Sequence, residues 1–315
     1  MVKTPLLLAF GSHTGHDTSK APSSSFFKKS IELFLEQTVL KQDKKVNIIY
    51  ENLSLDLSEF PDRSKWSSLI NLKGEKRKKL VEKLQKRLDK REASINQLFA
   101  HTMNRGREIP SEFIDYKLHF DSWGFNDSII LLNQEKPDSV KCIIEPQKAE
   151  SVILGWRYNL VFEEIYKQDL NSQLIPAMLK EYIEYLYEFD FIRDKFILEL
   201  VKKLSRDPRN CIAIPRGYAH CGMATFFDDE KFDVTLRKDE VNPDFISEAV
   251  ISMYQQNIIE EQITHFARLQ LQDWRYAKEH INDLGYILLR AIRMERFANK
   301  QLHKRAREFA LKSSS

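Results

Sequence analysis

The 315-residue chain has little cysteine, glycine or proline and no long hydrophobic run. Three cysteines cannot all pair, and Cys142 and Cys211 fall in strand-like apolar runs, so we expect reduced thiols in a cytosol-like compartment. Nine glycines and ten prolines are few for this length and indicate long helices. No run reaches the roughly 18 apolar residues of a membrane-spanning helix. The first apolar run, residues 5–10, is too short for a signal-peptide core. These features predict a cytoplasmic protein without a membrane span.

The charge is nearly balanced, with 49 basic and 46 acidic residues and a net charge of +3. Nucleic-acid-binding domains are usually strongly basic, so no specific nucleic-acid partner is expected. Ten of the basic residues nevertheless fall within residues 73–91. The segment 74–104 has apolar residues at heptad spacing and is predicted to be a helix. Its charged face is either simply solvated, with the apolar stripe packed on its own domain, or a surface for a protein partner or RNA.

Five short segments are predicted to be the strands of a sheet: residues 5–10, 46–50, 140–144, 211–214 and 232–236. Between the first two lies an amphipathic helical segment, residues 25–40, and a β-α-β unit of this kind joins parallel strands. We therefore predict a single α/β domain over residues 1–315, with a mixed, mostly parallel sheet flanked by helices.

The rest of the chain is predicted to be mostly helical. A polar helical insertion occupies residues 62–134 and includes a helix at 111–134 with a break near Trp123 and Gly124. A helical C-terminal region occupies residues 242–312. Further helices are predicted at residues 149–168, 172–187, 190–205 and 223–227.

Polar side chains follow four of the predicted strands. His13 and His16 come after the first strand, Glu51 after the second, Glu145 after the third and His220 after the fourth. Ligands of open α/β sheets bind beyond the carboxyl ends of the strands, so we expect these residues to share a site. A histidine beside a carboxylate can act as a general base. Two or three imidazoles with a carboxylate can also bind zinc, manganese or cobalt, and the spacing does not decide between the two.

Arg193 and Asp194 lie near the start of the predicted helix at 190–205. An acid in a first helical turn commonly complements the helix dipole, whereas an arginine near strand ends can hold an anionic or carbonyl group of a ligand. Cys221 is not favoured as a nucleophile, because nothing predicts a lowered thiol pKa. The remaining histidines fall on predicted helices and are interpreted as structural: His101, His119, His265, His280 and His303.

Taken in order, these pieces resemble the superfamily that joins the erythromycin esterases, the ChaN haem-uptake proteins, TraB and the Tiki proteases. Its pattern is an apolar strand with a Gly-Glu-x-His motif, a strand ending in Glu, an Arg-Asn or Arg-Asp pair, and a strand leading into Gly-x-x-His. The similar positions here are residues 6–13, 48–51, 193–194 and 217–220. Only the last motif is met fully. The first reads Phe10-Gly11-Ser12-His13 and lacks the acid, and His16 offers an alternative register.

The resemblance implies a hydrolase in which His13 or His220 activates water, directly or through a bound metal. Glu51 would be the partner base, or a metal ligand together with the two histidines. The substrate, a small molecule or a peptide, would be contacted by Arg193, His16 and Glu145. One alternative is a non-catalytic protein that binds a ligand such as haem on the same scaffold. Another is an interaction protein that acts through its basic helices, with a protein partner on the helix at 74–104.

The resemblance also selects Glu51 over its neighbour Asn52. Side chains alternate between the two faces of a strand, so only one of two adjacent residues can point into a site at the strand's end. The apolar residues of the strand at 46–50 lie on both faces and do not settle which face that is.

Overall fold

The structure is a computed structural model that describes residues 3–11, 22–52, 63–113, 117, 120–121, 123–167, 174–227 and 231–238. The chain divides into two compact units, each of which is described by itself. The first comprises Met1–Ile153 and Phe189–Asp239, and the second comprises Leu154–Glu188 and Glu240–Ser315. The predicted C-terminal helices at 242–312 lie outside the described residues, and the single domain over residues 1–315 stays a prediction.

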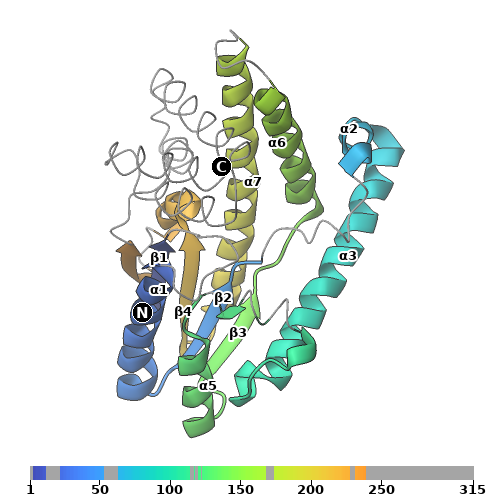
Figure 1. Cartoon of the computed structure of the whole chain (residues 1–315). Coiled ribbons are helices and arrows are strands. Elements are labelled where there is room, and N and C mark those ends of the chain that lie inside the picture. Colours follow the sequence, from blue (N-terminus) through green and yellow to red (C-terminus); the bar gives the residue numbers. More distant parts are fainter. Residues whose placement is uncertain are drawn as a thin grey trace, which may run out of the picture. The chain divides into compact units, whose positions relative to one another are not determined.

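The first unit is built on a five-stranded parallel sheet (Figure 1). Its strands are β1 (Thr4–Gly11), β2 (Lys45–Tyr50), β3 (Val140–Ile144), β4 (Asn210–Gly217) and β5 (Phe232–Lys238). The strand order is β3-β2-β4-β1-β5. The predicted α/β class is confirmed, and the described sheet is wholly parallel rather than mixed. β1 and β2 are parallel as expected, but β4 lies between them, so the β-α-β unit joins strands that are not neighbours.

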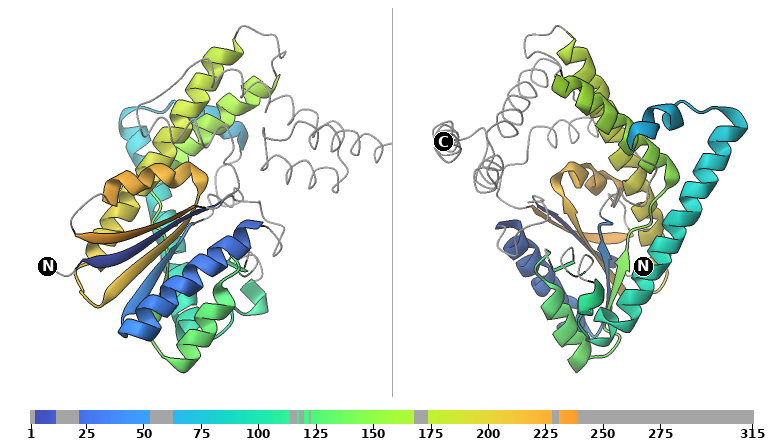
Figure 2. Two further views of the ribbon diagram at one scale, coloured as in Figure 1. Left: turned by 90° about the vertical axis from the view of Figure 1, so that its left-hand side faces the viewer. Right: turned by 45° about the vertical axis from the view of Figure 1, so that its right-hand side comes forward.

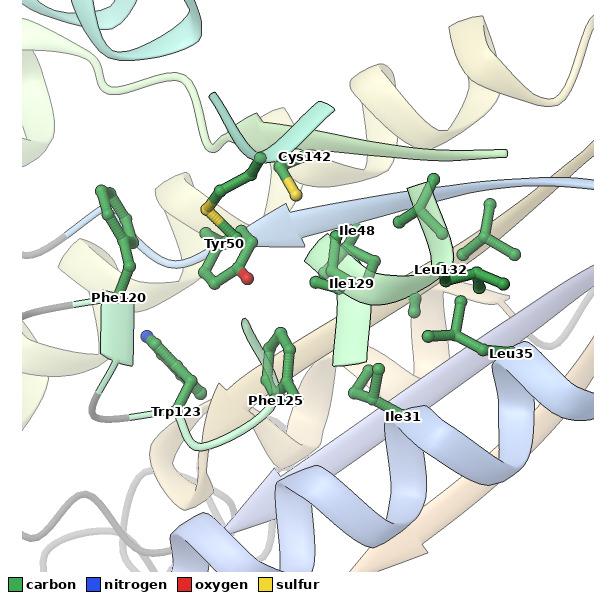
Figure 3. Packing of buried hydrophobic residues seen from close by; sticks show 14 of the residues in the cluster. Ile31, Leu35, Ile48, Tyr50, Phe120, Trp123, Phe125, Ile129, Leu132 and Cys142 are labelled. Carbon is green, nitrogen blue, oxygen red and sulfur yellow. The ribbon is translucent and has the colours of Figure 1, made fainter. Parts of the chain in front are cut away.

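Helices cover both faces of this sheet. One face packs on α1 (Pro22–Leu35), on the end of α3 (Gly74–His101) and on α5 (Asn126–Glu135). Figure 3 shows this core, in which Ile31 of α1 and Ile129 of α5 pack with Ile48 of β2 and Cys142 of β3. The C-terminal half of α7 (Ile175–Leu204) and a 3₁₀ helix (Tyr218–Phe227) cover the opposite face (Figure 2). Burial on both faces explains why the inner strands are continuously apolar.

Three asparagine side chains accept hydrogen bonds from the backbone along the outer edge of β3. The amide oxygen of Asn133 accepts a hydrogen bond from Val140 N–H at 3.0 Å, and those of Asn104 and Asn96 accept from the next outward-facing N–H groups of the strand at 2.7 and 3.0 Å. An exposed edge strand can pair with other chains, so these side chains replace the missing neighbour.

Replacing Asn133 by alanine should lower the free energy of unfolding by about 2 kcal/mol, because it leaves buried backbone groups unpaired. The Asn133 amide also donates to the carbonyl oxygens of Met103 and Val140, at 2.9 and 2.8 Å. Urea unfolding would measure the loss. The matched control is Asn71→Ala, whose exposed amide donates a single bond to Ser67 O at 2.8 Å and should cost well under half as much.

Two helix predictions need correction. The predicted helices at 172–187 and 190–205 form one continuous helix, α7. No glycine or proline interrupts the chain between them, so nothing ends the first helix. The predicted helix at 111–134 begins as a 3₁₀ turn, Ser111–Phe113. Lys117, Phe120 and Asp121 are helical as predicted, and α5 starts after Gly124, whose φ of +79° lies at the predicted break.

The remaining elements are short or belong to the second unit. α1 continues as a π-helical segment, Glu36–Leu40, and α2 (Trp66–Ile70) and 3₁₀ turns at Arg63–Lys65 and Met103–Arg105 flank α3. The described part of the second unit is the end of α6 (Ala149–Lys167) and the start of α7. There the rings of Tyr158 and Tyr182 meet edge to face at 5.8 Å. None of the described helices is long and apolar enough to cross a membrane.

Candidate functional site

Three charged side chains stand where three strands end, all on the sheet face that α7 covers. Glu51 follows β2, Glu145 follows β3, and Arg216 is the penultimate residue of β4. Alternation along the strands puts them there: Tyr50 and Ile144 belong to the core beneath α1 and α5, so the residue after each points to the opposite face. This settles the question that the apolar pattern of β2 left open.

α7 and the 3₁₀ helix complete a cluster of seven charged side chains. Asp190, Arg193 and Asp194 are spaced three and four residues apart and therefore share one face of α7. His220 lies in the first turn of the 3₁₀ helix that follows β4. Every member of this set, which we call the charge cluster, is buried, and Glu51 is the most exposed at 9 %.

Arg193 joins the ends of β2 and β3. Its guanidinium donates to Glu51 Oε1 at 2.9 Å and to Glu145 Oε1 at 2.5 and 3.1 Å, and it lies 3.5 Å from Asp190 Oδ1. Burial opposes its charge, but these three carboxylates outweigh burial and raise the pKa of Arg193. Its donors therefore face protein carboxylates and leave little for a substrate.

Arg216, on β4, contacts two of these carboxylates, Glu51 and Glu145, and also Asp194. Its guanidinium contacts Glu145 Oε2, donates to Asp194 Oδ1 at 3.3 Å, and lies 3.7 Å from Glu51 Oε1. Glu145 is thus clamped between two guanidinium groups. Since Glu145, Asp194 and Arg216 are all inaccessible to solvent, water cannot balance their charges, and the contacts within the cluster take its place.

His220 lies between carboxylates on both sides of its ring. Nδ1 is 2.8 Å from Asp194 Oδ1, and Nε2 is 3.5 Å from both Glu51 Oε1 and Asp190 Oδ1. Burial lowers the pKa of His220 and Arg216 lowers it further, but Asp194 and Asp190 prevail and raise it to about 9. With this pKa His220 is an imidazolium at neutral pH, so both ring nitrogens carry a proton and Nδ1 donates to Asp194. Burial raises the pKa of Asp190, because it disfavours the charged carboxylate, and this effect exceeds the lowering by nearby His220 and Arg193.

The structure brings together four of the residues that the sequence singled out: Glu51, Glu145, Arg193 and His220. His13 and His16 lie outside the described residues, as does the side chain of Cys221. Among the other histidines, His101 is exposed at the end of α3, and the remaining four lie outside the described residues.

Sequence reasoning missed Asp190 and Arg216 as site residues and read Asp194 as a complement to a helix dipole. A signal for Arg216 was present, because it is the one charged residue in the buried run of β4 and shares a face with Ile212 and Ile214. The dipole interpretation of Asp194 fails because the residue lies in the middle of α7, far from either end.

The described members of the cluster do not fit a metal or a haem iron. Among the residues that the structure describes, no three His, Cys, Asp or Glu side chains are grouped as they are around a metal ion. Glu51 and Glu145 accept from guanidinium groups, and both nitrogens of His220 face carboxylates. The expected metal site of His13, Glu51 and His220 stays a prediction.

Comparisons with known proteins found no family model, curated protein or solved structure that matches this chain. Membership in the superfamily named above therefore stays a prediction from its motifs.

Proposed function

We propose that the chain is a hydrolase of esters or amides whose reaction centre lies at Glu51 and His220. The observation that supports this most directly is the row Asp194–His220–Glu51, with ring-to-carboxylate distances of 2.8 and 3.5 Å. A carboxylate on one ring nitrogen fixes the orientation of the imidazole and directs the other nitrogen at its target. This row stands at the carboxyl edge of a parallel sheet, where α/β proteins bind their ligands.

The positive charge of His220 determines which role it can have in the reaction. An imidazolium cannot take a proton from water, so His220 donates from Nε2, stabilising the oxyanion and protonating the leaving group. Water activation is then assigned to His13, for which the resemblance implies the same role as for His220, with Glu51 as the partner carboxylate. The attacking water loses its proton to His13 and its oxygen bonds to the carbonyl carbon. The ester C–O or amide C–N bond then breaks, and the leaving group takes the proton of His220.

The two arginines act as positioning residues in this mechanism. Arg193 and Arg216 already face Glu51, Glu145, Asp190 and Asp194, so they hold the carboxylates in place. Arg193 was expected to contact substrate, and we now assign it to the support of Glu51.

Glu51→Gln should fold normally and lose at least tenfold in hydrolysis, whereas Asn52→Ala should be nearly silent. The amide keeps the size of Glu51 but removes the charge that faces Nε2 of His220. Asn52 is the matched control, because it meets Arg193 and Gln147 through its main-chain oxygen, which the substitution retains. The assay would use p-nitrophenyl acetate and butyrate, a macrocyclic lactone and a fluorogenic peptide, with circular dichroism to verify folding.

Three results would count against the proposal: no hydrolysis of any of these substrates, full activity of Glu51→Gln, or unfolding of that variant with an otherwise active wild type.

Whether a metal takes part in the reaction needs a separate measurement. Elemental analysis of untagged protein would detect a bound metal, and assays in EDTA would show whether the reaction needs it. If a histidine base acts alone, activity in EDTA is retained. If a metal assists the reaction, activity is lost in EDTA and restored by zinc, manganese or cobalt.

A further inference from the structure

We infer that the exposed lysines of α3 bind the phosphate backbone of a nucleic-acid duplex, without sequence specificity and independently of the charge cluster. Residues 73–91 carry ten basic and three acidic side chains, a net charge of +7, whereas the whole chain has +3. Outside residues 73–91 the charges of the chain therefore sum to −4, although residues 290–312 are also basic.

The cations are arranged as a row along the helix. Lys79, Lys83, Lys86 and Lys90 are spaced four, three and four residues apart, so they share one side of α3, and all four are exposed. None of them has an ion pair with any carboxylate in the part of the chain that the structure describes. Three of them, with Arg87 and a single acid, Glu82, line a surface depression of about 340 Å³.

The opposite side of α3 packs against the rest of the first unit. Leu84, Leu88, Ile95 and Phe99 are buried, and Asn96 binds the edge of β3. Figure 1 shows α3 beside β3, the edge strand of the sheet. The helix is thus held along its apolar stripe, and the lysine row is not needed to hold it.

Duplex nucleic acid fits this row better than a protein or a membrane does. At 1.5 Å per residue, the four lysines span about 16 Å, a length over which B-DNA presents roughly nine phosphates. Protein interfaces place apolar residues at their centres, and membrane-binding helices carry large apolar residues beside their lysines. No large exposed apolar side chain lies on α3 among the described residues. A single strand would require exposed aromatic rings for stacking, which α3 also lacks.

The test compares Lys79→Gln/Lys83→Gln/Lys86→Gln with the wild type by fluorescence anisotropy. Labelled DNA and RNA duplexes of about 20 base pairs serve as probes, over a range of salt concentrations near 0.1 M. The wild type should bind both, and the triple variant should bind at least tenfold more weakly. Because each phosphate contact contributes about 0.9 to the slope of log K against log salt, that slope should fall by about 2.7.

A control variant with the same change in net charge is Lys29→Gln/Lys141→Gln/Lys203→Gln, built from exposed lysines elsewhere in the first unit. It should bind as the wild type does, within about twofold, if the row rather than total charge is responsible. Equal losses in both variants would overturn the inference, as would the absence of saturable duplex binding. Binding to polyglutamate or to phosphatidylserine vesicles at the same salt, with none to duplexes, would overturn it in favour of another partner.

Discussion

Replacing Arg216 by methionine should lower the free energy of unfolding by about 3–5 kcal/mol. The guanidinium is fully buried and contacts Glu145 and Asp194, which are themselves inaccessible to solvent. Methionine retains most of the volume but none of the charge, so two buried carboxylates lose a counter-ion and cannot be rehydrated. The loss would be measured from urea unfolding at neutral pH, followed by tryptophan fluorescence.

The matched control is Arg209→Met. Arg209 pairs with Asp207 at 3.0 Å, but its side chain is 71 % exposed, and surface pairs of this kind contribute little to stability. A second variant, Arg216→Met/Glu145→Gln, should recover part of the loss, because it removes one of the two carboxylates that lost a counter-ion. Equal costs for Arg216→Met and Arg209→Met would show that the cluster does not depend on buried charge pairing.

All five strands could be predicted from the sequence because four are short, mainly apolar segments and the fifth, β5, alternates apolar and polar residues. The parallel direction of β1 and β2 followed from the helix between them. The position of β4 between these strands could not be predicted. It depends on pairing between segments more than 150 residues apart, such as Leu6 with Ile212, and no local pattern specifies such pairs.

The candidate site was predictable at the strand ends and not beyond them. Glu51 and Glu145 follow strands directly, and the parallel sheet gathers such positions at one edge. Asp190 and Asp194 became part of the site because α7 runs unbroken across that edge. The sequence was interpreted as two helices, which placed these acids in a first turn and made a dipole role the simplest explanation. An error of one helix boundary therefore changed the interpretation of the site.

Raising the pH from 6.5 to 9 should cost the folded protein about 3 kcal/mol of stability through His220 alone. Its pKa is about 9 in the fold and 6.5 without perturbation. Below pH 6.5 the imidazole is protonated in both the folded and the unfolded state, so its pairing with Asp194, Asp190 and Glu51 contributes fully. Between the two values the unfolded chain has lost its proton while the folded chain keeps it, and the contribution declines. Above pH 9 the imidazole is neutral in both states, and its contribution to the free energy of unfolding is lost.

Urea unfolding at a series of pH values would measure this slope, and imidazole NMR would place the titration on His220 itself. His220→Gln should flatten the slope in this window, because glutamine does not titrate. His101→Gln, at an exposed position at the end of α3, should leave it unchanged. The same imidazolium is the proton donor of the proposed reaction, so hydrolysis should fall above pH 9 in parallel with the NMR signal. A His220 that titrates near 6.5 in the folded protein would contradict both the stability effect and the assignment of His220 as the acid, and would return it to the role of a base.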